Sequence, residues 1–363
     1  MPQQKEAEQP TATRPVCPVC GGLEAHTRFG RCRDLLYATP GEFNVMACAS
    51  CGLLFCHPQI TREQFSTYYL ASYYPAARQI MARCNSKRLA NRVRQWALRL
   101  FWGPVERETA MRRVARRVLS AFSNQLRMTP PAHGRRHLLE VGCSSGEKLF
   151  LLRRHGWEAE GIEPSTDACT EAAKLGLPVQ ASSLEDADLR GKTYDVIELC
   201  HVFEHLQDPT GSLTKLREAL APEGKILLTL PNARSLGRGV FGRCWRGLEV
   251  PRHCAAYTSG TMRALCSRLG LRVRRVRSMV APEVIVGSVK FALNEKLGPR
   301  KRPGAQAHPA CGSRCRPEKK LKALAGRLLR ICLSIVLLPP AILGFGEVMQ
   351  VEIVRVQPPS QDG

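Results

Sequence analysis

The chain has 363 residues, enough for one full core with attachments or for two modest domains. Apolar residues make up 44% and charged residues 23%, as in a globular protein, which argues against a disordered or fibrous chain. With 54 Lys and Arg against 31 Asp and Glu, the net charge of +23 favours polyanionic partners such as nucleic acid, anionic lipid or phosphorylated substrates. Residues 1–16 lack a signal peptide's apolar core, so we expect a flexible N-terminus and no secretion.

Residues 17–75 are expected to form a small zinc-binding module. Two C-x-x-C-G motifs stand here among several tyrosines and short strand-like runs. Four thiolates satisfy tetrahedral zinc and leave no open position, which predicts a structural Zn²⁺ site rather than a disulfide framework. The predicted ligands are Cys17, Cys20, Cys48 and Cys51. Cys32, Cys56 and His57 stay open as replacements for any one of them.

Residues 76–130 are predicted to be a basic helical segment. Between 78 and 117, twelve Lys and Arg residues stand against two acids, with Trp96 and Trp102 interleaved. Such a segment either joins a surface that binds anions or is a solvated helix that covers the core.

From 131 to 280, strand-like and helix-like stretches alternate. HLLEV, EAEGIEP, PVQAS, YDVIELC, KILLTLP and LRVRRVRSM are typical of strands, and helical patterns of ten to fifteen residues separate most of them. Ser165 is a candidate N-cap for one of these helices, and 208–224 is predicted to be another. The alternation predicts an α/β fold with βαβ units and a parallel sheet.

A glycine-rich turn follows the first of these strands. Gly142 and Gly146 allow the backbone to turn sharply and to approach a ligand closely. The second strand ends at Glu163, which in a doubly wound sheet lies beside that turn and can accept both hydroxyls of a ribose. The G-x-x-x-G spacing departs from the dinucleotide fingerprint, which favours a nucleoside ligand without a pyrophosphate.

The stretch HVFEH at 201–205 matches the H-x-x-E-H signature of inverted zinc proteases. That reading needs a long helix and a third ligand downstream, but Asp208-Pro209 would end such a helix early. We therefore expect the stretch to lie at the carboxyl edge of the sheet, in the ligand crevice.

LLEVGCSSG, GIEPS, YDVIELCHVFEHLQDP and LREALAPEGKILLTLPN, in this order, resemble the motifs of class I S-adenosylmethionine (SAM)-dependent methyltransferases. The resemblance implies a Rossmann-like seven-stranded sheet and SAM as the cofactor. It implies that Glu140, Gly142 and Gly146 border the methionine end of SAM and that Glu163 holds the ribose. The other implied cofactor-binding residues are Ser183, Leu184, Cys200 and His201.

LEVPRHCAAY resembles the acceptor-side segment of sugar methyltransferases, which implies that His253 is a general base. His205, in the pocket stretch, is the second catalytic candidate. Arg252 stands where some sugar C-methyltransferases have Glu, which counts against methylation of carbon. The order of Cys pairs before this domain also resembles zinc-fronted sugar methyltransferases of antibiotic and surface-polysaccharide pathways.

Residues 281–345 are predicted to be an insertion, before a final antiparallel strand in 346–358. The insertion contains a basic linker and an uncharged run at 331–346 that is too short for a spanning helix and contains two prolines. The run is either a buried core helix or an interfacial segment whose basic flanks suit anionic head groups.

The leading hypothesis is a SAM-dependent methyltransferase that acts on a sugar, glycolipid or other cell-envelope or secondary-metabolite precursor. A small molecule or lipid-linked saccharide is favoured over nucleic acid as the partner. The alternatives are an RNA methyltransferase with a zinc module, a ubiquinone-type lipid O-methyltransferase, and a catalytically silent scaffold that binds SAM. We expect a cytoplasmic protein, either free or peripheral at the inner face of the membrane.

Overall fold

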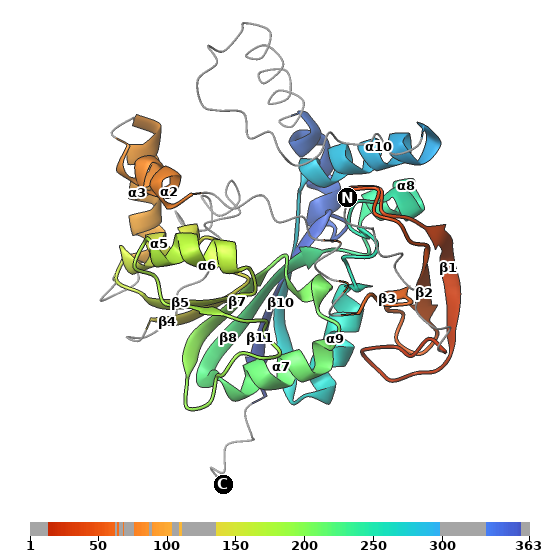
Figure 1. The fold of residues 1–363 in the computed structure, drawn as a ribbon, viewed down its shortest axis with the longest axis horizontal. Helices are drawn as coiled ribbons and strands as arrows, with labels where there is room; N and C mark the ends of the chain where they lie inside the picture. Colours follow the sequence, from red (N-terminus) through yellow and green to blue (C-terminus); the bar gives the residue numbers. More distant parts are fainter. Residues whose placement is uncertain are drawn as a thin grey trace, which may run out of the picture.

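A seven-stranded sheet is the centre of the molecule (Figure 1). The computed structural model describes residues 14–61, 64, 68, 76–86, 89–103, 109–110, 136–297 and 332–356. The strands follow the order β10-β11-β8-β7-β4-β5-β6. Their bounds are β4 His137–Val141, β5 Glu158–Glu163, β6 Val179–Ala181, β7 Tyr194–Cys200, β8 Leu220–Pro231, β10 Leu271–Met279 and β11 Val348–Arg355.

The sheet is mixed, with one antiparallel strand. β4 pairs in parallel with β5 and with β7, and β7 pairs in parallel with β8. β11 inserts between β8 and β10 and is antiparallel to both. The apolar runs of the central strands are buried because helices cover both faces of the sheet. The predicted seven-stranded Rossmann-like α/β fold is confirmed.

Helices lie on both faces of this sheet, as Figure 1 shows. Apolar residues of one helix set and of the sheet form a common core; the set is α2 Ala77–Asn85, α3 Leu89–Trp102, α5 Glu147–Arg153 and α6 Thr166–Ala173. The second core contains residues of α7 (Pro209–Glu218) and α9 (Ser259–Arg268). The predicted N-cap of α6 is present, since the Ser165 side chain accepts a hydrogen bond from Ala168 N.

Within the basic segment, α2 and α3 cover the core. Leu98, Phe101 and Trp102 are buried, and Trp157 Nε1 donates to the Trp102 carbonyl at 2.9 Å. Trp96, on the same helix, is exposed. The described part of this segment therefore fits the core-covering alternative. The rest of the segment, the N-terminal 13 residues, the linker at 298–331 and residues 357–363 lie outside the described residues.

The helix expected over 208–224 is shorter than predicted. α7 ends at Glu218, and β8 begins at Leu220, which pairs with Tyr194 of β7. Pro222 lacks the N–H that a helix interior requires, so the chain passes into the strand before it.

The N-terminal module is built around a second sheet with the order β1-β2-β3-β9. Its strands are β1 Ala25–Cys32, β2 Phe43–Cys48, β3 Leu54–His57 and β9 Ala255–Ala256. β9 comes from the segment that follows His253, so the acceptor-side segment completes the sheet of the module. Module residues such as Phe55 also share the core that contains α7 and α9, which joins the module firmly to the larger domain.

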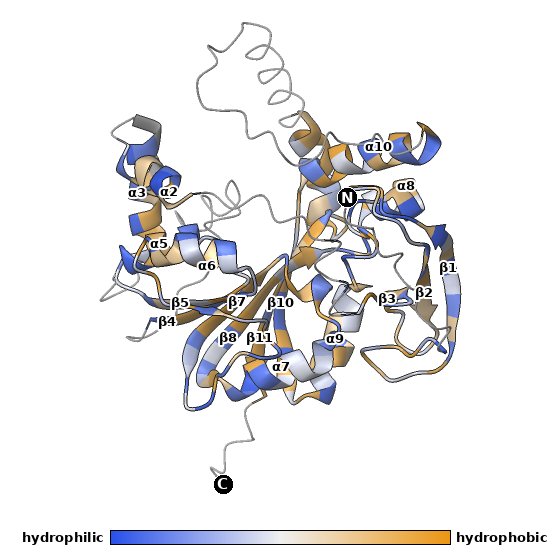
Figure 2. Ribbon diagram, viewed as in Figure 1, coloured by the Kyte–Doolittle hydropathy of each residue, from blue (hydrophilic) through white to orange (hydrophobic). Residues whose placement is uncertain are grey.

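The segment between β10 and β11 carries an exposed apolar surface. It contains α10 (Pro282–Leu297) and a helical stretch at 332–342, with several orange turns in Figure 2. Large apolar side chains with about half or more of their surface exposed include Leu293, Leu297, Ile335, Val336, Leu338, Ile342 and Leu343. The stretch at 332–342 buries Leu337 and Ala341 but exposes Ile335, Val336, Leu338 and Ile342, unlike a buried core helix. Among the residues that the structure describes, no helix combines the length and apolar character needed to cross a membrane.

Candidate functional site

The glycine-rich turn lies at the carboxyl end of β4. Gly142 and Gly146 have φ angles of 71° and 77°, in the left-handed region that favours glycine. The Gly142 N–H donates to the Ile162 carbonyl at 2.8 Å, which fixes the turn against β5. A Cβ on Gly142 would lie 2.4 Å from Val202 Cγ2. The turn therefore touches the HVFEH stretch directly.

Glu163, at the end of β5, ties two loops of this edge together. One carboxylate oxygen accepts a hydrogen bond from Ser144 N and the other from Ser165 N, each at 2.9 Å. Burial raises the pKa of Glu163, against the opposing effect of these two N–H donors. Each oxygen retains a second lone pair, so the carboxylate can hold these loops and also accept ligand hydroxyls.

Glu140 is a buried acid directly before the turn. Its Oε2 has no hydrogen-bond partner in the described part of the chain. Burial raises the pKa of Glu140 to about 8, although Lys148, which is paired with Glu198, opposes this rise. A buried carboxyl group with an unsatisfied oxygen suits a cationic ligand group.

The remaining predicted cofactor residues lie on the same edge of the sheet. Ser183 follows β6 and its hydroxyl donates to Asp186 Oδ2 at 3.0 Å, while Leu184 is buried. Cys200 ends β7 and is exposed. β4, β5, β6 and β7 are adjacent and parallel, so their carboxyl ends form one continuous edge. The roles of these residues remain predictions.

HVFEH does not form the long helix of a zinc protease. After β7 the chain turns at His201, whose φ is 55°, and enters a 3₁₀ helix, η2 (Phe203–His205). His201 Nδ1 lies 3.2 Å from Glu204 Oε1. Burial would lower the pKa of His201, but its hydrogen bond to Glu204 and the charge of Glu204 outweigh that and raise it.

The two catalytic candidates lie against each other. The rings of His205 and His253 meet edge to face, with centroids 4.7 Å apart. Ligand atoms of these two residues and of Glu204 all lie within 4.8 Å of one another. Cys254 N donates to the Glu204 carbonyl at 2.8 Å, which holds the two segments together. Burial, and then the charge of His253, lower the pKa of His205 to about 4.

Arg252 is turned away from this cluster. Its guanidinium forms two hydrogen bonds to Asp34 of the N-terminal module, at 2.8 and 3.0 Å, and one to Glu249. The carboxylate beside His253 comes from Glu204 instead. The sequence pattern gives Glu204 no role of its own within HVFEH, because its neighbour His253 lies 49 positions away. No signal in the sequence pointed to Asp34.

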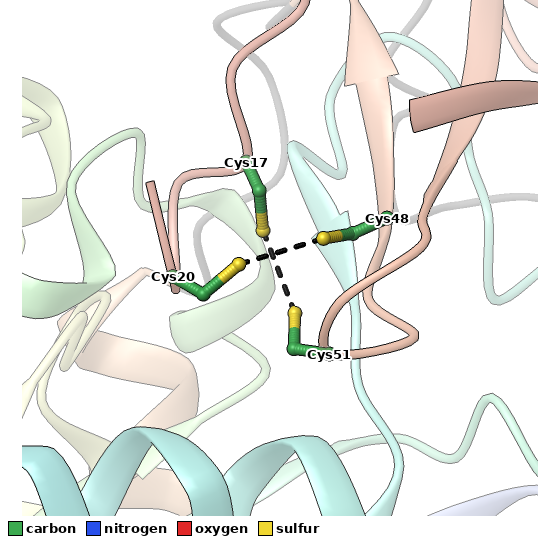
Figure 3. Close-up of side chains that lie close together, drawn as sticks. All are labelled: Cys17, Cys20, Cys48 and Cys51. Atoms are coloured by element: carbon green, nitrogen blue, oxygen red, sulfur yellow. Dashed lines mark hydrogen bonds between the residues drawn. The ribbon is translucent and has the colours of Figure 1, made fainter. Parts of the chain in front are cut away.

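The four cysteines of the two C-x-x-C-G motifs point at a common centre (Figure 3). Cys17 Sγ lies 3.5 Å from Cys51 Sγ, and Cys20 Sγ lies 3.4 Å from Cys48 Sγ. All four sulfur atoms lie within 4.8 Å of one another. Tetrahedral zinc with Zn–S bonds of about 2.3 Å needs sulfur atoms about 3.8 Å apart. The cluster therefore fits a zinc ion.

Residues 107–276 match the family described as "Methyltransferase domain". A curated relative is the ubiquinone biosynthesis O-methyltransferase of Cereibacter sphaeroides (strain ATCC 17025 / ATH 2.4.3). It is 26% identical over 140 residues, which cover 36% of this chain and 56% of that protein. The chain thus matches little more than half the length of this relative.

Solved structures that match this chain include the plantazolicin methyltransferase BpumL in complex with SAH. It has 14% identity and a TM-score of 0.39, and the match covers 81% of this chain and 94% of that one. A SAM-dependent methyltransferase from Archaeoglobus fulgidus has 17% identity and a TM-score of 0.38, and the match covers 66% of this chain and 91% of that one. Residues 107–276 of this chain are therefore similar to a methyltransferase domain.

Proposed function

We propose that the protein transfers the methyl group of SAM to a sugar, glycolipid or other precursor of the cell envelope or of a secondary metabolite. The proposal depends on one contact, between the glycine-rich turn and the HVFEH stretch. The glycine turn assigned to SAM touches the HVFEH stretch through Val202, and that stretch bears the cluster of His205, His253 and Glu204. A cofactor edge and an acid–base cluster side by side are what methyl transfer to a hydroxyl requires.

The residues at the edge fit SAM. Gly142 and Gly146 let the turn pack closely against Val202 and Leu177, where a Cβ would clash, and Glu163 offers lone pairs for the ribose hydroxyls. The unsatisfied carboxyl oxygen of Glu140 suits the cationic methionine end. Ser183 and Leu184 would border the adenine, and Cys200 and His201 would complete the wall. When bound, SAM supplies an electrophilic methyl group on a sulfonium.

On the acceptor side, His205 and His253 are the proposed catalytic residues. Each Nδ1 lies within hydrogen-bond distance of a backbone carbonyl, Arg252 O at 3.0 Å for His205 and Gly247 O at 2.8 Å for His253. These bonds orient the rings and favour the tautomer with its proton on Nδ1. In this proposal the cluster orients the acceptor hydroxyl and assists the loss of its proton, with His253 as the base candidate.

A lipid-linked acceptor is favoured by the surface between β10 and β11. Its exposed apolar residues stand close in sequence to exposed Lys290 and Lys296, and α10 contacts α8 (Leu236–Phe241), where Val240 is exposed. Apolar side chains beside cationic ones suit an anionic membrane surface. We therefore propose a cytoplasmic protein that associates peripherally with the membrane.

Two other acceptors have specific support. Methylation of a lipid phenol is favoured by the similarity to a ubiquinone biosynthesis O-methyltransferase. RNA is favoured by the net charge of +23 and the zinc module. RNA ranks lower because the basic residues concentrate near the apolar and Trp-rich segments, and no Lys or Arg lies within Cys17–Cys20 or Cys48–Cys51.

Incubation of the protein with methyl-labelled SAM and a cell extract tests these acceptors. The extract is then separated into lipid, saccharide, RNA and protein fractions. We expect label in the lipid or saccharide fraction, at a higher rate when anionic vesicles are present. Label in RNA alone would contradict the proposed acceptor. SAM binding without label in any fraction would support the silent scaffold instead.

We also propose that Cys17, Cys20, Cys48 and Cys51 bind one structural Zn²⁺. Replacing Cys48 with Ser is expected to remove one equivalent of zinc. It should lower the free energy of unfolding by about 4 kcal/mol or more, the range typical of a lost metal site. Metal analysis and denaturant unfolding measure both effects. Cys332→Ser, at an exposed thiol, is the control and should change neither quantity. Full zinc content in the Cys48 variant would contradict the assignment.

A further inference from the structure

The HVFEH stretch and the segment around His253 form a second group of metal-ligating side chains. Glu204, His205 and His253 each offer one ligand atom, and these atoms lie within 4.8 Å of one another. The group comes from η2 and from the chain just before β9, and hydrogen bonds of Cys254 hold these two segments together. Cys254 N donates to the Glu204 carbonyl, and the Cys254 thiol donates to the His205 carbonyl at 3.3 Å.

Both imidazoles are oriented as metal ligands are. A histidine that binds a metal through one ring nitrogen usually donates the other N–H to a carbonyl or carboxylate, which fixes the ring and its tautomer. Here Nδ1 of His205 faces the Arg252 carbonyl and Nδ1 of His253 faces the Gly247 carbonyl. Nε2 is then the nitrogen that each ring can offer to a cation. The edge-to-face packing of the rings is compatible with two imidazoles on one ion.

The buried carboxylate of Glu204 gives independent support for a bound cation. Its carboxylate is buried, with 1% of the residue exposed, and Oε1 contacts His201. Oε2 has no hydrogen-bond partner among the residues that the structure describes. A buried carboxylate oxygen without a partner is costly, and a bound cation would satisfy it.

We propose that Glu204, His205 and His253 bind a divalent transition-metal ion of the zinc type, next to the SAM edge. Two imidazoles and one carboxylate form a ligand set that suits Zn²⁺ and related ions better than Mg²⁺ or Ca²⁺. Three protein ligands leave at least one position for water or for the acceptor, unlike the closed four-cysteine cluster.

The role of this ion rests on the proposed function. An acceptor hydroxyl bound at the open position becomes more acidic and releases its proton to water. The resulting oxygen anion attacks the methyl carbon of SAM, the C–O bond forms as the C–S bond breaks, and S-adenosylhomocysteine leaves with the sulfur electron pair. In this form of the proposed function the ion replaces His253 as the group that promotes loss of the proton, and His205 and His253 act by holding the ion.

Zinc analysis of the intact protein tests the binding without any activity assay. Protein freed of metal and dialysed against Zn²⁺ is expected to contain two equivalents of zinc per chain. The variants Glu204→Gln and His253→Gln are each expected to contain one equivalent. Both variants keep the size of the side chain but weaken or remove a ligand. His26→Ala, at an exposed histidine on β1, is the matched control and should keep both equivalents.

Zinc-edge X-ray absorption of the wild type gives a second readout that does not depend on variants. Two occupied sites should give an average shell of about half sulfur and half nitrogen and oxygen, whereas the cysteine cluster alone gives sulfur only. One equivalent in the wild type with a sulfur-only shell would overturn the proposal, and so would two equivalents in both variants. Methyl transfer by a protein with only the cysteine-bound zinc would refute this site and leave the proposed function standing. Two bound zinc ions without methyl transfer to any extract would support this metal site and contradict the proposed function.

Discussion

Replacing Glu163 with Gln is expected to lower the affinity for SAM by roughly 100-fold, which corresponds to about 3 kcal/mol. The carboxylate accepts from Ser144 N and Ser165 N, so each oxygen already holds one loop of the site. An amide turns one of these acceptors into a donor that faces a backbone N–H. The ribose would lose a charged acceptor, and the loop that faces the amide would lose its anchor.

Titration calorimetry with SAM measures this effect, and thermal unfolding without SAM separates lost affinity from lost stability. Glu158→Gln is the matched control, since Glu158 lies on the same strand with its side chain exposed. It should bind SAM as the wild type does. A Glu163 variant with unchanged affinity would show that this carboxylate does not hold the nucleoside and would remove the basis of the cofactor assignment.

Local patterns of the sequence determine most of the larger domain. The alternation of strand and helix patterns predicts six strands of the seven-stranded sheet, because buried strands need apolar runs and covering helices need one apolar face. The strand-like segment in 346–358 predicts the seventh. The position of Glu163 beside the glycine-rich turn is predicted in the same way, since the tip of the second strand must lie beside the first loop. The four cysteines could also be grouped by their motifs, and their sulfur atoms lie together in the structure. The segment boundaries predicted from composition remain predictions.

Contacts between distant segments could not be predicted. The pairing of β3 with β9 brings Phe55 against Ala255, two residues separated by 200 positions, and no periodicity encodes that choice. The place of Glu204 beside His253 depends on another distant contact, the hydrogen bond from Cys254 N to the Glu204 carbonyl. The contact of Asp34 with Arg252 depends on how the N-terminal module packs on the larger domain. Such contacts depend on the packing of the whole chain, whereas patterns in a single sequence predict only local structure.

The Asp34–Arg252 pair leads to the second large effect. Replacing Asp34 with Ala is expected to lower the free energy of unfolding by about 3–5 kcal/mol, the usual cost of leaving one partner of a buried ion pair alone. Both side chains are almost fully buried, at 0% exposure for Asp34 and 2% for Arg252. Asp34 also accepts hydrogen bonds from Leu36 N and Tyr37 N, so the variant loses the turn that follows it as well.

The pair also predicts that the free energy of unfolding depends on pH. Burial alone would raise the pKa of Asp34, but the hydrogen bonds and charge of Arg252 outweigh it and lower the pKa. Because the folded pKa is depressed, the stabilisation is complete above the unfolded pKa of about 3.9 and is lost as the pH falls through the folded value. The stability difference between wild type and Asp34→Ala should therefore narrow only in acid below about pH 4.

Denaturant unfolding of four proteins separates the pair from the surrounding turn: the wild type, Asp34→Ala, Arg252→Met, and the double variant. Arg252→Met leaves Asp34 buried without its cation and should cost a similar amount. The double variant removes both charges and should be more stable than the sum of the single losses implies, because no unpaired charge remains buried. Asp188→Ala, which breaks the exposed pair with Arg190, is the control and should leave the unfolding midpoint unchanged. Strictly additive losses in the double variant would mean that the two side chains stabilise the fold independently. The N-terminal module would then not be anchored to the acceptor-side segment through this ion pair.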